Sequence, residues 1–311
     1  MRKLSRAGSI ATGALALALT AGAFAFTPTA GAVPAAASGT PPPLTSIRPG
    51  HPMETGGSRP AAPAFATNAI KTTTSSNWAG YVGVRSGITF RFVSAHFYVP
   101  YLDCTGVTKS NPTYSSHWVG LDGFLAGSNT VEQTGVLAAC YPDQNNVVTP
   151  TYDAWYEKYP NPPVYSAITV RPGDAITASV YFSSSKKTFT FTLADGTSGK
   201  HFTVVGKCPV SATCARSSAE VISEAPSNGT NVLPLADYQA ASFVGASLTD
   251  STGTKKGGLA TKYWDDYRIS QLSDGTNLDA AGSTIPQGTR IALPTSLVSN
   301  ATFDAYWMPG T

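Results

Sequence analysis

Residues 188–193 read TFTFTL, a strict alternation of polar and apolar side chains. In an extended strand, successive side chains point to opposite faces, so Phe189, Phe191 and Leu193 share one face. Residues 175–182 repeat the pattern. A period of two residues is typical of an antiparallel sheet that rests one face on a core.

The same pattern continues outward from these two predicted strands. Turn sequences recur between short apolar runs, among them RPGD at 171–174 and SDG at 273–275. We find no long amphipathic helix and no internal repeat. Many short strands within residues 75–311 predict one all-β domain, a jelly-roll-like β-sandwich of two antiparallel sheets.

Composition limits the class of protein. Of the 311 residues, 42% are hydrophobic and 13% are charged, which provides enough apolar side chains for a core. Residues 72–311 hold 15 Lys and Arg against 17 Asp and Glu, so this part lacks the basic surface of a nucleic-acid binder. So few bases also limit charge repulsion at low pH, and the few acids leave little stability that depends on their ionisation. Both features favour operation in acid.

The N-terminus has the three parts of a secretory signal peptide, which we place at residues 1–32. Three bases within the first six residues precede an apolar run at 10–26 and small residues at 30–32. A membrane anchor is the alternative, but the run is short and rich in alanine. The sequence therefore predicts a secreted, extracellular protein with no membrane segment after cleavage.

Residues 33–74, here termed the leader, hold eight prolines and many small residues. Such a segment cannot bury a core of its own. It is either a flexible linker or a propeptide whose bases Arg48, His51, Arg59 and Lys71 contact an acidic cleft. For a propeptide, we expect an attraction at neutral pH that fades as the carboxylates protonate near about pH 4.

The chain has four cysteines, and an even number in an exported protein predicts disulfides. Three pairings are possible, and the most economical joins Cys104 to Cys140 and Cys208 to Cys214. A zinc site is the alternative, but CxxC is absent and histidines are few. We expect neither a metal nor a cofactor.

Acids and amides lie among aromatic residues in three parts of the sequence, whereas motifs of serine, metallo- and nucleotide-dependent enzymes are absent. The parts are SHWVGLDG at 116–123 with VEQTG at 131–135, YDAWYEKYP at 152–160, and AEVISEAP at 219–226. Strand alternation places Asp153, Trp155 and Glu157 on one face, and likewise Glu220 and Glu224. The first face, made of acids and aromatics, indicates a cleft wall. The alternatives are a solvated face for Asp153 and Glu157, charged edge strands for Glu220 and Glu224, and a backbone bond at a sheet edge for Gln133.

These segments, together with SNWAG at 76–80, resemble the eqolisin family, the glutamic peptidases, in the family's order. The resemblance covers about residues 75–226 and is weak beyond about 235. It implies a concanavalin-like jelly-roll sandwich of two packed antiparallel sheets. The chain departs from the family pattern at Val221 and Ala225, where an aromatic residue and an aspartate are common.

The resemblance also implies a catalytic pair, Gln133 and Glu224, which we expect on adjacent strands of one sheet. Glu224 would take a proton from a water, and the Gln133 amide would stabilise the oxyanion. A glutamate with its ordinary pKa of about 4.3 stays partly ionised in mild acid. The residues predicted to bind substrate around this pair are Trp118, Asp122, Asp153, Trp155 and Glu157.

The sequence thus predicts a secreted, monomeric acid endopeptidase that cleaves proteins or peptides and that its own leader could inhibit. Two rival hypotheses concern glycans. A carbohydrate-binding module would use Trp118, Trp155 and Tyr159, and a glycosidase would use Glu157 and Glu224. Both leave Gln133 without a role.

Overall fold

The structure, a computed structural model, describes residues 43–64 and 69–309, which belong to one compact unit. The predicted signal peptide, residues 1–32, and the start of the leader lie outside them. Within the described ranges, the helical content is a 3-10 turn at Leu44–Ser46. No helix of these ranges is long and apolar enough to cross a membrane.

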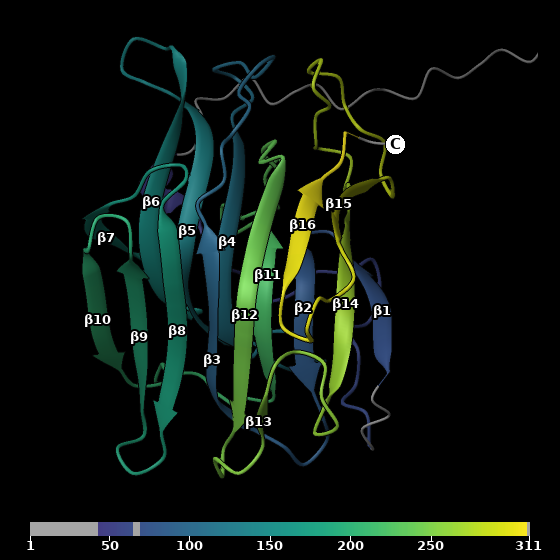
Figure 1. The fold of residues 1–311 in the computed structure, drawn as a ribbon. Coiled ribbons are helices and arrows are strands. Elements are labelled where there is room, and N and C mark those ends of the chain that lie inside the picture. Colours follow the sequence, from purple (N-terminus) through teal and green to yellow (C-terminus); the bar gives the residue numbers. More distant parts are fainter. Residues whose placement is uncertain (1–42, 65–68, 310–311) are drawn as a thin grey trace, which may run out of the picture. The chain divides into compact units, whose positions relative to one another are not determined.

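The strands form two layers that face each other (Figure 1). The first layer contains, in spatial order, β10 (His201–Gly206), β9 (Thr188–Asp195), β8 (Ala175–Ser183), β3 (Phe90–Tyr98), β12 (Ala240–Asp250) and β16 (Phe303–Trp307). The second contains β14 (Asp265–Leu272), β2 (Trp78–Val84), β11 (Ser218–Glu224), β4 (Thr113–Leu121), β5 (Val131–Pro142), β6 (Val148–Tyr159) and β7 (Val164–Thr169).

The predicted sandwich is confirmed, with one difference in connectivity. Strand β15 (Arg290–Pro294) pairs with both β16 and β14, so the two layers form one continuous hydrogen-bonded path. Strand β13 (Lys256–Gly257) pairs with β12, and β1 (Ile70–Ser75) adds the one parallel strand pair among the described residues, with β14. Regular structure therefore begins at Ile70, before the boundary that we expected at 75.

The main core fills the space between the layers. Phe189, Phe191 and Leu193 of β9 are fully buried in it, as the alternating pattern predicts. Strands β3 and β8 of the first layer lie opposite β4 and β5 of the second. Burying one such large apolar side chain stabilises the fold by about 1.5–3 kcal/mol, so this core fixes both layers.

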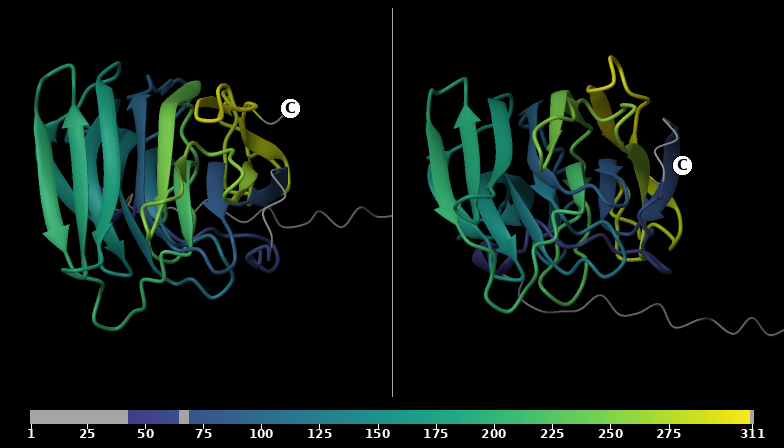
Figure 2. Two further views of the ribbon diagram at one scale, coloured as in Figure 1. Left: turned by 60° about the horizontal axis from the view of Figure 1, so that its bottom comes forward. Right: turned by 90° about the horizontal axis from the view of Figure 1, so that it is seen from below.

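A second apolar cluster lies on the outer face of the second layer. Trp78, Trp118 and Trp155 belong to it, and so do Ile47 and Met53 of the leader. The described leader residues thus pack across this face, as Figure 2 shows for the purple segment. They are not a free linker.

Both predicted disulfides are confirmed. Cys104 bonds to Cys140 and ties the loop before β4 to the far part of β5. Cys208 bonds to Cys214 and closes a small loop between β10 and β11. The first bridge therefore fastens two strands of the second layer, whose outer face carries the candidate site.

Candidate active site

The strand register aligns three rows of side chains across β11, β4, β5 and β6. They are Glu220, Gly120, Gln133 and Glu157; Ile222, Trp118, Gly135 and Trp155; and Glu224, Ser116, Leu137 and Asp153. Residues directly opposite one another in neighbouring strands point to the same face of the sheet. All three rows therefore lie on the outer face, beneath the leader.

Gln133 and Glu224 share this face, but they are not on adjacent strands. Strand β4 lies between β5 and β11, so that prediction was wrong. Glycines leave space between the two residues. A Cβ atom at Gly135 would lie 2.5 Å from Cβ of Trp118, and one at Gly120 would lie 2.9 Å from Cζ3 of the same indole. These glycines make room for the Trp118 side chain.

Glu224 is fully buried and accepts three hydrogen bonds. Trp118 Nε1 donates to Oε2 at 2.7 Å, while Asn77 Nδ2 and the backbone N–H of His51 each donate to Oε1 at 3.1 Å. Burial raises the pKa of Glu224 well above its usual value, the Trp118 bond lowers it, and the charge of Glu157 raises it further. Burial beneath the leader therefore favours the protonated form of Glu224. This differs from the ordinary pKa that we expected.

Gln133 is fixed by its neighbour on β6. Its Nε2 donates to Glu157 Oε2 at 2.8 Å, and both side chains are fully buried. Glu157 also lies 4.0 Å from Nη1 of Arg48 in the leader. Burial raises the pKa of Glu157 well above its usual value, while the Arg48 charge and the Gln133 bond lower it.

The leader passes between these two side chains. A Cβ atom built on Gly50 would lie 2.0 Å from Nε2 and 2.3 Å from Oε1 of Gln133, so this glycine rests directly on the amide. The next residue, His51, donates its backbone N–H to Glu224 and accepts from Trp78 Nε1 at 2.9 Å. The peptide group that joins Gly50 to His51 therefore lies between Gln133 and Glu224.

The remaining predicted site residues lie further from this pair. Asp122, at the end of β4, is buried and accepts bonds from the backbone N–H groups of Arg216 and Ser217. Burial raises the pKa of Asp122, and these bonds lower it. Asp122 thus stabilises the segment before β11. Asp153 is half-buried, and burial raises its pKa. Trp155 is fully buried in the outer apolar cluster.

Four residues that contact the pair or the leader were not predicted for a peptidase site, and Tyr159 had a role only in the rival carbohydrate-binding hypothesis. Asn77 and Trp78 lie within the SNWAG motif, so the motif itself was the available signal. Tyr159 places its hydroxyl 3.1 Å from His51 Nε2, and Tyr165 donates to the Ile47 carbonyl at 2.8 Å. Tyr165 lies on β7, which no motif covered.

A serine–histidine contact exists elsewhere in the same strands. His117 Nδ1 lies 3.0 Å from Ser223 Oγ, but both side chains are fully buried. They alternate with Trp118 and Glu224, so they face the main core and not the leader. Burial lowers the pKa of His117 to about 3. This pair is a core contact and cannot reach a substrate.

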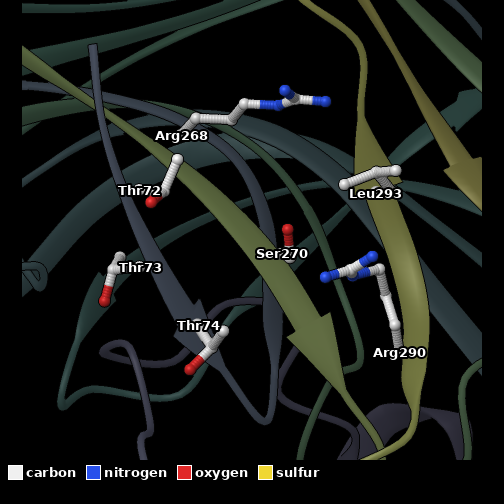
Figure 3. A pocket seen from close by; sticks show the side chains of 7 residues that line it. All are labelled: Thr72, Thr73, Thr74, Arg268, Ser270, Arg290 and Leu293. Carbon is white, nitrogen blue, oxygen red and sulfur yellow. The ribbon is translucent and has the colours of Figure 1, made fainter. Parts of the chain in front are cut away.

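A surface pocket of about 530 Å³ lies on β1, β14 and β15, away from the pair. Figure 3 shows its lining, which includes Arg268 and Arg290. Arg268 donates through Nε and Nη2 to the carbonyl of Pro294, so it fastens one strand to the next. The pocket lining contains no carboxylate that could act as a base, and we assign it no chemistry.

Comparisons with known proteins identify the family of this chain. The profile of the Peptidase A4 family matches residues 76–284. The chain is 31% identical to aspergillopepsin-2 of Aspergillus niger over 58% of its own length and 66% of that protein. It is 30% identical to scytalidopepsin B of Scytalidium lignicola over 72% of its own length and 82% of that protein.

Solved structures give the same result. Scytalido-glutamic peptidase with a transition state analog inhibitor is similar with a TM-score of 0.57 and 27% identity, over 76% of this chain and 100% of that one. A complex of the same enzyme with a peptide-based transition state analog gives a TM-score of 0.55 and 26% identity over the same shares. The chain therefore belongs to the peptidase A4 (eqolisin) family, the glutamic peptidases, and is a hydrolase of that class.

Proposed function

We propose that the protein is a secreted acid endopeptidase that hydrolyses peptide bonds with Gln133, Glu224 and an activated water. The observation that carries the proposal is the placement of one peptide group of the leader between these two side chains. An extended chain in that position stands where a substrate would lie. The two disulfides support secretion, because such bonds persist in oxidising compartments.

The chemistry follows from the two functional groups. Ionised Glu224 takes a proton from a water that lies between it and Gln133, and the oxygen attacks the substrate carbonyl carbon. The Gln133 amide donates to the oxyanion that forms. Glu224 then returns the proton to the leaving amine. The reaction requires no covalent acyl-enzyme, and one chain supplies both groups, so we expect a monomer to be active.

The other predicted residues have supporting roles in this proposal. Trp118 holds the carboxylate of Glu224, and Glu157 orients the amide of Gln133. Trp155 forms the apolar floor of the cleft. Asp153 contributes to the end of the cleft beside Tyr165, and Asp122 keeps the segment before β11 in place.

The leader acts, we propose, as an inhibitor that covers the pair. The backbone N–H of Arg48 donates to the Ser227 carbonyl at 2.8 Å, and the backbone N–H of Ser227 donates to the Arg48 carbonyl at 3.0 Å. Beyond the pair, Met53 donates to the Gly123 carbonyl at 3.0 Å. Ile47 and Met53 are buried as well. Apolar burial and backbone bonds thus dominate the attachment.

Charge attraction contributes less than the sequence suggested. Of the four bases expected to contact the cleft, Arg48 lies near a wall carboxylate, whereas Lys71 pairs with Asp265 of β14. Arg59 donates to the Gly123 carbonyl, and His51 approaches Glu224 through its backbone. Acid therefore removes little of the binding energy.

The expected effect of pH on leader binding also differs in sign from the one that the sequence suggested. Burial raises the pKa of both Glu224 and Glu157, so the leader-covered site favours their protonated forms. The groups that face them are Arg48, His51 and each other. We therefore expect protonation to accompany leader binding, so that acid alone would not release the leader. Release requires another step.

Replacement of Glu224 by Gln tests the proposed activity, because it keeps the shape and removes the base. We expect hydrolysis of a denatured protein at about pH 4 to fall by a factor of about 10³ or more, with the fold unchanged. The matched control is Glu132→Gln, an equally buried carboxyl on the opposite face of β5, which should retain activity. Full activity in Glu224→Gln would refute the assignment, and so would loss of activity with a metal chelator.

A further inference from the structure

We propose that the peptide bond between Gly50 and His51 is the first bond that the enzyme cuts in its own leader. The inference rests on the proposed function of Gln133 and Glu224. It assigns a specific processing site within residues 43–64, and it supplies the release step that acid alone does not provide.

The two residues of this peptide bond each lie against one member of the pair. The Cα of Gly50, next to the carbonyl carbon, rests on the Gln133 amide. The His51 nitrogen, which would become the leaving amine, lies 3.1 Å from Glu224 Oε1. Hydrolysis needs an amide donor beside the carbonyl and a proton donor beside the nitrogen. With Gly50 on Gln133 and the His51 nitrogen at Glu224, the leader lies in the direction that we propose for a substrate.

Anchors on both sides keep this bond at the pair. Upstream, the two bonds between Arg48 and Ser227 and the bond from Tyr165 to the Ile47 carbonyl fix the chain. Downstream, Asn77 Nδ2 donates to the Pro52 carbonyl at 3.3 Å, in addition to the Met53 bond described above. A reacting bond that is fixed on both sides reacts without the entropy cost of a bimolecular encounter.

The step balances without any co-reactant except water. Glu224 ionises in a fraction of the leader-bearing molecules. A water beside the carboxylate then gives it a proton, and the water oxygen bonds to the Gly50 carbonyl carbon. The bond from that carbon to the His51 nitrogen breaks, and Glu224 passes the proton to the nitrogen. The products are a carboxyl group at Gly50 and an amine at His51.

The cut also explains how the upstream piece leaves. Once ionised, the new carboxylate of Gly50 is a charge in a buried site, which favours its exposure to water. The downstream piece stays covalently attached to the domain. Cleavage thus converts a chain with anchors on both sides into an upstream fragment that retains only the anchors before Gly50.

The test follows the leader-bearing protein after transfer from about pH 7 to several values between about pH 3 and 6. Intact mass and N-terminal sequencing identify the first new terminus. We expect His51, with a complementary fragment that ends at Gly50, at a rate independent of protein concentration. A first cut elsewhere that still requires Glu224, or a protein that digests substrate with this bond intact, would overturn the inference. Absence of all hydrolysis would instead refute the proposed function.

A substitution at Gly50 gives a second test. In Gly50→Ala, the added Cβ would overlap the Gln133 amide, which is itself held by Glu157. We expect the cut after residue 50 to slow by about a hundredfold, because a small displacement of the bond suffices for that loss. The matched control is Gly57→Ala, where nothing lies within 4 Å of an added Cβ. Equal rates in both variants would contradict the proposed register.

Discussion

Glu224 receives its hydrogen bonds from three separate parts of the chain: Trp118 on β4, Asn77 beside β2, and the backbone of His51 in the leader. The first two donors belong to the domain and stay when the leader departs. Hydrogen bonds to a carboxylate favour its charged form, and so lower its pKa. The domain therefore provides a site in which Glu224 can ionise once water replaces the leader.

The Trp118→Phe substitution should expose this effect in the processed enzyme. Loss of the indole donor raises the pKa of Glu224, because the bond lowers it in the native protein. The acid limb of the kcat profile should then move to higher pH by about one unit, since a bond to a charged group is worth about 1.5–3 kcal/mol. Measurement of kcat against pH decides the matter. An unchanged limb would mean that Trp118 does not act on Glu224.

At the scale of the strands, two glycines make room for the indole that lies between the proposed catalytic residues. Gly120 and Gly135 occupy the positions of β4 and β5 over which the Trp118 side chain lies. A larger residue there would meet either that indole or backbone atoms. The glycines of the motifs WVGLDG and QTG therefore serve packing.

Gly135→Ala should destabilise the domain and reduce activity together. The new Cβ would lie 2.2 Å from the His117 carbonyl oxygen and 2.5 Å from Cβ of Trp118. Overpacking of this kind costs about 1–3 kcal/mol. Denaturant unfolding measures the loss. The control is Gly196→Ala, whose Cβ would make an ordinary 3.4 Å contact with the Ala175 carbonyl oxygen. Equal stability of the two variants would contradict the packing role of Gly135.

The sequence predicted individual strands well, because one buried face imposes a period of two on segments such as β9. It did not predict the order of strands. Strand β11 enters between β2 and β4 through long-range pairing that no local pattern encodes, so adjacency of Gln133 and Glu224 was wrong. The assignment of these two residues came from family resemblance. The spacing of residues along a predicted strand indicated only which face of the strand each side chain occupies.

The position of Gly50 and His51 could not be predicted from sequence for a different reason. The leader has no periodic pattern, and its closest contacts with the pair use a backbone N–H group and a glycine without a side chain. Every residue type except proline carries that donor. Only the folded arrangement shows which peptide group meets the pair.

For the whole molecule, the buried acids make the stability depend on pH, which the composition did not show. Burial raises the pKa of Glu132 and Glu220 well above the usual value of 4.5, and the charges of Asp122 and Arg216 act on Glu132 in opposite directions. Folding therefore favours the protonated forms. Their contribution to stability is complete below the unfolded pKa and is lost as pH rises through the folded pKa. From the composition, we had expected stability to depend little on the ionisation of these acids.

We therefore expect the free energy of unfolding to be greater near about pH 4 than near about pH 7. Each buried carboxyl should lower it by about 1.4 kcal/mol per pH unit over the range between its two pKa values. Denaturant unfolding of leader-bearing Glu224→Gln, which cannot process itself, measures this without cleavage. Addition of Glu132→Gln should reduce the slope. Greater stability near pH 7, or a slope that Glu132→Gln leaves unchanged, would count against the account.

The central claim is that β5 and β11 bring Gln133 and Glu224 together to act as one catalytic unit. The most direct measurement is a double-mutant cycle of Gln133→Ala and Glu224→Gln, with kcat/KM determined on a peptide substrate for all four leader-free proteins. Residues that act on one transition state are strongly non-additive. We predict that the double variant loses no more than the more damaged single variant. Losses that multiply, or a single variant with native activity, would contradict the claim.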